Sequence, residues 1–236
     1  MFRFKEFVVE DSDCAMKVCT DSCILGAWVH SNESKKILDI GAGSGLISLM
    51  LAQRFERANI IAIEIDEKAS KQCISNFDNS PWKESLDVIN QDFISYLSDE
   101  KFDLIVSNPP FYENNLKSDN SQKNIAHHAQ SLSFKQLIEG VVKNIAANGK
   151  FFVLLPAQTF EQFMAIVHSN STLQTFEILE ISNFIAEIPF RYIVQFQCID
   201  EKVESNTKSL AIKVSRQNNV YTPEFAQLLK DYYLIF

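Results

Sequence analysis

Short hydrophobic runs and amphipathic stretches alternate along the first two thirds of the chain. Runs rich in Val, Ile, Leu and Phe predict buried strands at residues 36–40, 59–65, 86–89, 102–107 and 149–155. Between them, apolar side chains recur at helical spacing and predict helices at residues 46–54, 67–77 and 133–146. This alternation is typical of a parallel sheet whose two faces are covered by helices.

A different pattern follows Pro156. After a predicted helix at residues 159–168, three strand-like runs follow one another without long helices between them, at residues 176–181, 191–199 and 209–214. Such direct connections favour antiparallel pairing at this end of the sheet. An amphipathic helix is predicted at residues 223–233, and no segment has the composition of a linker. We therefore expect a single α/β domain over residues 1–236.

The composition is that of an ordinary globular protein, with 236 residues of which 46% are hydrophobic and 22% charged. The apolar runs are too short to cross a bilayer, and the N-terminal residues lack the apolar stretch of a secretory signal. Five cysteines, an odd number, fit a reducing compartment. We therefore expect a cytoplasmic protein with no membrane segment.

The formal net charge of −8 argues against a protein that coats nucleic acid non-specifically, since such binding depends on Lys and Arg. An enzyme with a local basic patch remains compatible with this charge. No metal site is expected. Cys19 and Cys23 lack a second pair of ligands, and the adjacent His127 and His128 point in different directions on a regular element.

A glycine-rich turn follows the first predicted strand. Gly41, Gly43 and Gly45 lie between Asp39, near the end of that strand, and the helix that follows. Glycine permits a tight turn and lets backbone amides come close to a ligand. A dinucleotide-binding turn would have its third glycine one position later, where this chain has Leu46. The turn therefore favours a nucleoside that carries an amino-acid group over a pyrophosphate.

Acidic residues follow at the ends of the next two strands. Glu64 ends the second strand, where a carboxylate can accept both hydroxyls of a ribose. Asp92 comes just after the third strand and is placed to accept the amino group of an adenine, while Ile65 or Phe93 can flank the ring. A glycine turn alone indicates only a tight turn. Three elements in this order on successive strands indicate a nucleoside site.

This ordered set resembles the class I S-adenosylmethionine-dependent methyltransferases, over roughly residues 35–200. The resemblance implies a Rossmann-like α/β fold with a seven-stranded, mostly parallel sheet, helices on both faces and the last strand antiparallel. Residues 37–200 would form the catalytic core and residues 201–236 a C-terminal strand and helix. It further implies S-adenosylmethionine as the cofactor, with Asp39 and the glycine turn at its methionine part, Glu64 at the ribose and Asp92 at the adenine.

A second motif, Asn108-Pro109-Pro110-Phe111-Tyr112, follows the fourth predicted strand. The two prolines remove two backbone donors, so that carbonyl oxygens here point outward unpaired, and Asn108 adds a side-chain acceptor. Together these groups can accept both hydrogens of a planar amino group. If these two hydrogens are bound in directions that favour a tetrahedral geometry at the amino nitrogen, the lone pair of that nitrogen is freed for in-line attack on a methyl sulfonium. Phe111 offers a flat face on which a base can stack, and Tyr112 is a further candidate substrate contact.

The alternative interpretation of this motif is a proline-terminated strand followed by a buried Phe. Its position after the fourth strand of this fold favours the chemical interpretation. The motif also resembles that of amino-methyltransferases, which act on adenine N6, guanine N2 or glutamine N5. The resemblance of this motif to that of the amino-methyltransferases implies that Asn108, Pro109, Pro110 and Phe111 are catalytic, with Asn108 also beside the cofactor.

Both ends of the chain resemble the bacterial valine-tRNA (adenine-N6)-methyltransferases, in the runs 17–21, 25–28, 221–225 and 229–234. This resemblance implies that residues 1–36, with Lys17 and Thr20, form a lead-in that closes over the cofactor. It implies that the substrate is the adenine next to the anticodon of valine tRNA. A base in that loop is already largely single-stranded, so extruding it costs little. Ordinary packing of the two ends is the alternative.

Three alternatives remain open on the sequence. A guanine-N2 rRNA methyltransferase would use the same chemistry at Asn108. A glutamine-N5 methyltransferase usually has Tyr in place of Phe111 and an added N-terminal helical domain. A cofactor-binding module without catalysis would not need the Asn-Pro-Pro-Phe run. We expect a monomer with tRNA as its partner, a polar loop at 113–124 beside the site, and phosphate contacts among Arg3, Lys5, Lys17, Lys117, Lys123 and Arg191.

Overall fold

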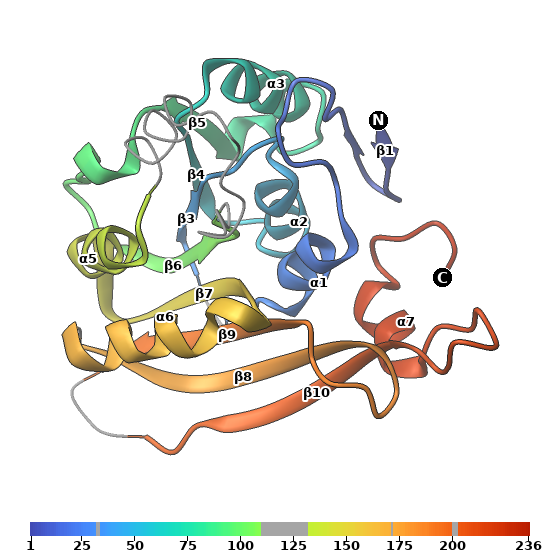
Figure 1. Ribbon diagram of the computed structural model, residues 1–236. Helices are drawn as coiled ribbons and strands as arrows, with labels where there is room; N and C mark the ends of the chain where they lie inside the picture. The colour runs from blue at the N-terminus through green and yellow to red at the C-terminus, as the bar shows by residue number, and fades with distance from the viewer. Residues whose placement is uncertain (32–33, 110–131, 171, 200–202) are drawn as a thin grey trace, which may run out of the picture.

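The structure, a computed structural model, describes residues 1–31, 34–109, 132–170, 172–199 and 203–236 (Figure 1). An eight-stranded sheet runs through the molecule in the order β10-β8-β9-β7-β6-β3-β4-β5. Its strands are β3 (Lys36–Ile40), β4 (Asn59–Glu64), β5 (Leu86–Asn90), β6 (Phe102–Ser107), β7 (Ile145–Pro156), β8 (Leu173–Phe184), β9 (Arg191–Cys198) and β10 (Asn206–Lys213). A separate antiparallel pair is formed by β1 (Phe2–Arg3) and β2 (Val8–Val9).

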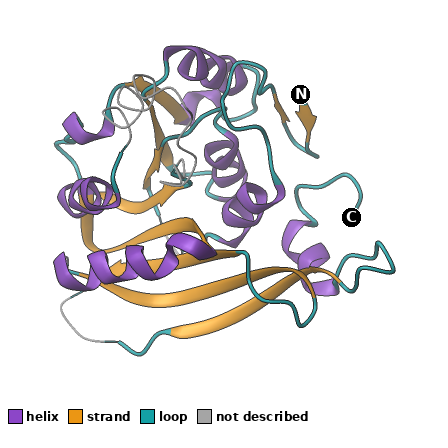
Figure 2. Cartoon of the chain, in the orientation of Figure 1, coloured by secondary structure: helices purple, strands orange, loops and turns teal. Residues whose placement is uncertain are grey.

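Helices cover both faces of the sheet (Figure 2). They are α1 (Thr20–Trp28), α2 (Leu46–Arg54), α3 (Glu67–Asp78), α5 (Phe134–Asn144), α6 (Ala157–Asn170) and α7 (Pro223–Leu229), with short 3₁₀ turns η1 (Lys83–Ser85) and η2 (Phe93–Ser95). Successive side chains of a strand point to opposite faces. In β7, Phe152 therefore joins the core under α1, α2 and α7, whereas Phe151 joins the core under α5 and α6.

The predicted α/β fold is confirmed, with one difference in strand number. Strand β9 is antiparallel to both β7 and β8, and all other neighbouring pairs of the large sheet are parallel. The seven expected strands are joined by an eighth, β10, which pairs in parallel with β8 from Asn206↔Glu177 to Lys213↔Phe184. This pairing satisfies backbone groups along the outer edge of β8, and it buries Leu210 and Ile212.

Two helices end earlier than predicted, and a third helix is not predicted, for local reasons. Helix α5 ends at Asn144, whose side-chain Nδ2 donates to Gly140 O at 2.9 Å, and β7 begins one residue later. Helix α7 ends at Leu229, because the next turn closes on the Leu229 carbonyl. Helix α1 is buried from Ser22 to Ala27, so it lacks the alternation of polar and apolar positions by which an amphipathic helix is predicted.

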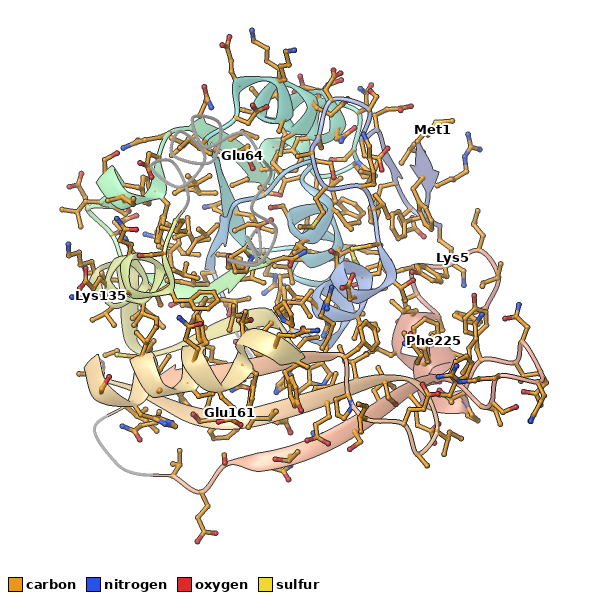
Figure 3. All side chains as sticks on the ribbon, viewed as in Figure 1. Met1, Lys5, Glu64, Lys135, Glu161 and Phe225 are labelled. Atoms are coloured by element: carbon orange, nitrogen blue, oxygen red, sulfur yellow. The ribbon has the colours of Figure 1, made fainter. Side chains whose placement is uncertain are left out.

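The two ends of the chain lie side by side. The Lys5 ammonium donates to Lys230 O at 2.5 Å and to Phe236 O at 2.9 Å, so it ties the N-terminal pair of strands to the C-terminal segment (Figure 3). The ring of Phe4 stacks on Phe7 with centroids 4.5 Å apart and lies 6.0 Å from that of Tyr233. In the described part of the chain, no helix is both long enough and apolar enough to span a membrane.

Candidate active site

Asp39, Glu64, Asp92 and Asn108, which the sequence singles out, gather at one edge of the sheet, where the parallel strands end. The chain runs from β3 outward through β4 to β5, then returns to place β6 on the other side of β3. Such a reversal of strand order opens a crevice at the carboxyl ends of the strands, where open α/β sheets bind ligands. Ser107 at the end of β6 donates its hydroxyl hydrogen to Ile40 O of β3 at 2.9 Å, which holds the two strand ends together.

Glycine is required at the three positions of the turn for two different reasons. All have positive φ, 73° at Gly41, 56° at Gly43 and 79° at Gly45, a region that other residues rarely adopt. A Cβ at Gly41 or Gly43 would project into open space, whereas a Cβ at Gly45 would lie 2.5 Å from the Phe77 ring. The first two glycines therefore border free space at the edge of the sheet, and the third allows α3 to pack closely.

Glu64 joins the glycine turn to the end of β4 (Figure 3). Its side chain is buried, with Oε2 accepting from Gly43 N at 2.8 Å and Oε1 from Asp66 N at 2.9 Å. Each carboxylate oxygen has a further lone pair with which it can accept another hydrogen bond. Glu64 can therefore brace the turn and bind hydroxyl groups of a ligand at the same time.

Asp39 is fully buried behind the glycine turn. Its Oδ2 accepts from Ser48 Oγ at 2.7 Å and from Ser48 N at 3.1 Å, which ties α2 to β3. Its Oδ1 has no hydrogen-bond partner among the described residues. Burial, with a smaller contribution from the charge of Glu64, raises the pKa of this carboxyl to about 7, although the two hydrogen bonds from Ser48 act to lower it. An unpaired buried acceptor of this kind attracts a cationic or hydrogen-bonding group.

Asp92 follows β5 by two residues and lies beside exposed apolar side chains. Asp92 is exposed, and its Oδ1 accepts from Ile94 N at 2.9 Å. Ile65 and Ile94 are 54% and 47% exposed, unusual values for isoleucine beside buried strands. Phe93 is instead buried in the core, against Gly140 of α5, which leaves Ile65 as the exposed one of the two expected flanking side chains. Nothing in the sequence pattern marks Ile94.

Asn108 follows β6, with one half of its amide bound and the other half free. Its Nδ2 donates to Ser22 Oγ at 2.8 Å and to Met16 Sδ at 3.3 Å. A thioether sulfur can accept but not donate, so this contact orients the amide with its NH₂ group toward α1. The side chain is buried, and Oδ1 has no partner among the described residues. The amide thus presents an oriented, unpaired acceptor at the end of β6.

Part of the second motif lies outside the described residues. Pro109 is buried directly after Asn108. Pro110, Phe111 and Tyr112 lie outside the described ranges, as do the polar segment 113–124, Lys117, Lys123, His127 and His128. No group of three His, Cys, Asp or Glu side chains that could hold a metal occurs among the residues that the structure covers.

The lead-in segment is tied to the glycine turn through a residue that the sequence does not mark. Asn76 of α3 accepts from Glu10 N at 3.0 Å and donates to Glu10 O and Ser44 O, both at 2.8 Å. Lys17 donates to Asp11 O and Ser12 O, so its ammonium holds the lead-in in a compact turn. Only the packing of α3 brings Asn76 between the lead-in and the turn, 66 and 32 positions away along the chain.

The two remaining expected residues lie on the other side of Asn108. Thr20 begins α1 and lines a pocket with Lys213 and Tyr221. Arg191 begins β9, and its Nε donates to Asp21 Oδ2 at 2.9 Å while the guanidinium lies 5.5 Å from the centre of the Phe190 ring. The structure therefore groups Asp39, the three glycines, Glu64, Ile65 and Asp92 at β3–β5, with Asn108 at β6 and with Thr20 and Arg191 beyond it.

The chain matches the family model of the methyltransferase small domain over residues 14–140. A relative from Bacteroides fragilis, named tRNA1(Val) (adenine(37)-N6)-methyltransferase, is 39% identical over 99% of this chain and 97% of its own length. A relative of the same name from Dyadobacter fermentans is 36% identical over 100% of this chain and 98% of its own length.

Solved structures share the fold at low sequence identity. A predicted O-methyltransferase from Agrobacterium tumefaciens superposes with a TM-score of 0.69 at 18% identity, covering 89% of this chain and 96% of that one. A methyltransferase from Pyrococcus furiosus superposes with a TM-score of 0.60 at 17% identity, covering 81% of this chain and 89% of that one. These two likenesses bear on the fold alone.

Proposed function

Since the chain belongs to the family of bacterial tRNA1(Val) (adenine(37)-N6)-methyltransferases, within class I, we propose that it methylates the N6 amine of an adenine in tRNA. The methyl donor is S-adenosylmethionine, and the target is the adenine next to the anticodon of valine tRNA. The observation that carries the proposal on the structural side is the oriented, unpaired Oδ1 of Asn108.

The residues at the ends of β3, β4 and β5 fit this cofactor. Asp39 Oδ1 is a buried acceptor suited to the ammonium group of the methionine part, and the open sides of Gly41 and Gly43 leave room for it. We assign Glu64, whose carboxylate oxygens can each accept a further bond, to the ribose hydroxyls, and Asp92 with the exposed Ile65 to the adenine. When bound, S-adenosylmethionine supplies a methyl group on a positively charged sulfur.

The acceptor adenine is held by the Asn108 turn. Asn108 Oδ1 accepts one hydrogen of the N6 amine, and a backbone carbonyl beside the two prolines accepts the other. These two acceptors would orient the nitrogen lone pair toward the methyl group that bound S-adenosylmethionine would supply, and the proton lost from the nitrogen would pass to water. Because the amine becomes more tetrahedral and more positive as it reacts, these bonds strengthen in the transition state.

Specific features favour this function over the alternatives. Guanine N2 and glutamine N5 also present planar amines to such a site, and the relatives at 39% and 36% identity, both adenine-N6 enzymes by name, favour adenine. A module that only binds the cofactor gains nothing from leaving a buried acceptor unpaired, since such a group costs about 1–3 kcal/mol of stability. We assign substrate contacts to Phe111, Tyr112 and Arg191.

The decisive experiment follows the transferred methyl group. The protein is incubated with S-adenosylmethionine labelled in the methyl group and unmodified valine tRNA, and the RNA is digested to nucleosides. We expect label in N6-methyladenosine only. The matched control is the same tRNA with guanosine at the target position, which should remain unlabelled. Label in N2-methylguanosine, or in no RNA at all, would contradict the proposal.

We further propose that the enzyme acts as a monomer in the cytoplasm, where its tRNA substrate is found. Analytical ultracentrifugation at the concentrations used for the assay should give the mass of one chain, 26.9 kDa. A dimer that persists down to the assay concentration would contradict the proposal that the enzyme acts as a monomer.

A further inference from the structure

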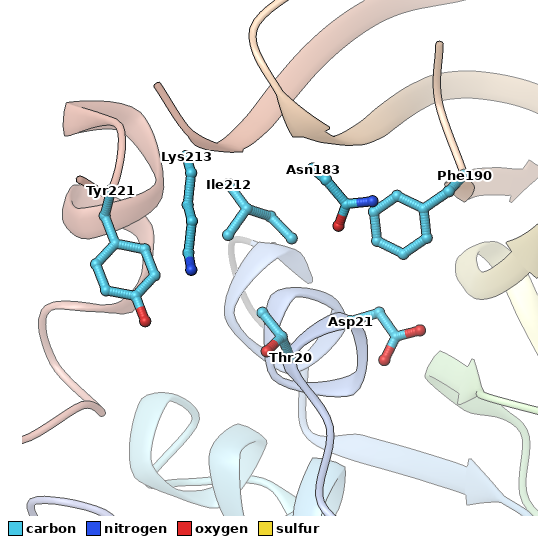
Figure 4. A pocket seen from close by; sticks show the side chains of 7 residues that line it. All are labelled: Thr20, Asp21, Asn183, Phe190, Ile212, Lys213 and Tyr221. Carbon is cyan, nitrogen blue, oxygen red and sulfur yellow. The ribbon is translucent and has the colours of Figure 1, made fainter. Parts of the chain in front are cut away.

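The pocket lined by Thr20, Lys213 and Tyr221 opens at the carboxyl edge of the sheet, beyond Asn108 on the side away from β3–β5. Its volume is about 360 Å³, within the range of small-molecule sites, about 300–1,000 Å³. The first turn of α1, the ends of β8 and β10, the residue before β9 and Tyr221 form its walls (Figure 4). Asp39, Glu64, Asp92 and the glycines of the turn do not line it, whereas Thr20 of the lead-in does.

The pocket combines the groups that bind a nucleotide in a single strand. Phe190 and Tyr221 line the pocket with aromatic rings, and stacking on such a ring tolerates every base. The Tyr221 ring already stacks on Phe225, with centroids 5.1 Å apart, so the stacking role falls to Phe190. Asn183 and Asp21 present an amide and a carboxylate, which can bond to the edge of a base, and Asn183 lies beside Phe190 in Figure 4. Lys213, 5.5 Å from the centre of the Tyr221 ring, supplies a positive charge for a phosphate.

The charged side chains at the pocket suit an RNA ligand, because its lysine shares the pocket with an aspartate that is already paired with Arg191. The protein carries a net charge of −8, so attraction of a phosphate backbone depends on local cations. Arg191 neutralises Asp21 through the 2.9 Å ion pair, which limits the repulsion that this carboxylate would exert. Lys213 is bonded to the neutral amide of Asn219 rather than to a carboxylate.

The pocket is joined to the catalytic residue through α1. Asp21 is followed in the chain by Ser22, whose hydroxyl accepts from Asn108. In the sheet, only β7 separates β6, which precedes Asn108, from β9, which begins just after Phe190. Two inter-strand spacings amount to about 10 Å, a span that a neighbouring nucleotide can bridge. An extruded base at Asn108 would thus bring the adjoining nucleotide to this pocket.

We propose that the pocket binds a nucleotide adjacent to the target adenine, that Phe190 and Lys213 hold this nucleotide, and that Asn183 sets the preference for its base. Phe190 stacks the base, Asn183 reads its edge and Lys213 binds its phosphate. This inference rests on the proposed function, because it requires that an RNA adenine occupy the site at Asn108.

The test uses anticodon stem-loop RNAs in which the base on either side of the target adenine is replaced by each of the other three. For the wild-type enzyme, we expect kcat/KM to vary by about 10-fold or more across one of the two series. Asn183→Ala should flatten that variation to less than about 3-fold. Phe190→Leu should raise KM by about 5- to 10-fold, since stacking is lost. Lys213→Gln should raise KM to a similar degree for every RNA and should reduce its salt dependence.

Matched controls separate a specific effect from a general one. Phe176→Leu changes a 40% exposed ring on β8, and Lys135→Gln a 67% exposed ammonium on α5; neither lies in the pocket, and both should leave KM and the base preference unchanged. All variants should bind S-adenosylmethionine like the wild type and have similar melting temperatures. If the wild type methylates the RNAs but the pocket variants leave preference and KM unchanged, the pocket inference is wrong and the proposed function stands. If the wild type methylates no RNA, both are wrong.

Discussion

Replacing Asn108 by alanine separates the chemical step from folding and from cofactor binding. The structure predicts a small effect on stability. The substitution removes two hydrogen bonds of Nδ2, each worth about 1 kcal/mol, and it also removes the unpaired Oδ1, whose burial costs about 1–3 kcal/mol. These contributions oppose each other, so we expect the free energy of unfolding to change by no more than about 1 kcal/mol.

The effect on turnover should be much larger. Loss of one oriented partner for charge that develops in the transition state typically lowers kcat by about 10²- to 10³-fold, or about 3–4 kcal/mol. Affinity for S-adenosylmethionine should change less than about 3-fold, because the residues proposed to hold the cofactor lie at β3–β5. The assays are single-turnover methylation of tRNA and calorimetric titration of the cofactor.

Two related variants sharpen the test. Asn108→Asp keeps an acceptor at the position of Oδ1 and should retain more activity than Asn108→Ala. Ser22→Ala removes the 2.8 Å bond that orients the amide, so it should lower kcat by about 5-fold while leaving KM for tRNA unchanged, as a loss of about 1 kcal/mol of positioning energy implies. An Asn108→Ala enzyme that keeps a tenth or more of its turnover, or that loses cofactor binding and turnover equally, would refute this reasoning.

Three further predictions follow from buried or constrained residues. Gln195 is fully buried, and neither atom of its amide group has a partner among the described residues, so Gln195→Met should raise the free energy of unfolding by about 1–2 kcal/mol in urea denaturation. Gly43→Ala places a methyl group in the open space of the turn and should weaken S-adenosylmethionine binding, whereas Gly45→Ala, 2.5 Å from Phe77, should mainly lower the melting temperature. Burial raises the pKa of Asp39 from 3.8 to about 7, so between these pH values the folded state keeps a proton that the unfolded chain has released. Without cofactor, the free energy of unfolding should therefore fall with rising pH by at most about 1.4 kcal/mol per pH unit. The fall should be smaller in Asp39→Asn, which has no carboxyl at this position.

Each of these predictions has its own contrary result. Unchanged or lower stability of Gln195→Met would mean that the amide is satisfied in solution. Equal loss of cofactor affinity in the two alanine variants would mean that Gly43 and Gly45 do not differ in role. A wild-type and an Asp39→Asn protein with parallel stability curves from pH 4 to pH 7 would show that this carboxyl does not titrate in that window. Circular dichroism at matched ionic strength serves for the pH series.

Much of the site follows from local pattern. The order of hydrophobic runs predicts the parallel strands, because a buried strand must be apolar on both faces. Gly41, Gly43 and Gly45 mark a turn with positive φ, since only glycine adopts that region without strain. The acidic residues at strand ends and the Asn108 motif then fall on one edge by topology alone, because parallel strands all end on the same side.

The tertiary structure decided which hydrogen-bond acceptors at that edge are left without a partner and can bind a ligand. Asn108 Nδ2 is bound by Ser22, 86 positions away, and Asp39 Oδ2 is bound by Ser48. The Oδ1 atom of each side chain lacks a partner among the described residues. The pocket between α1, β8, β10 and Phe190 likewise exists only in the folded chain. Burial and long-range hydrogen bonds depend on how distant segments pack, whereas residue type and spacing determine only which groups are available to be packed.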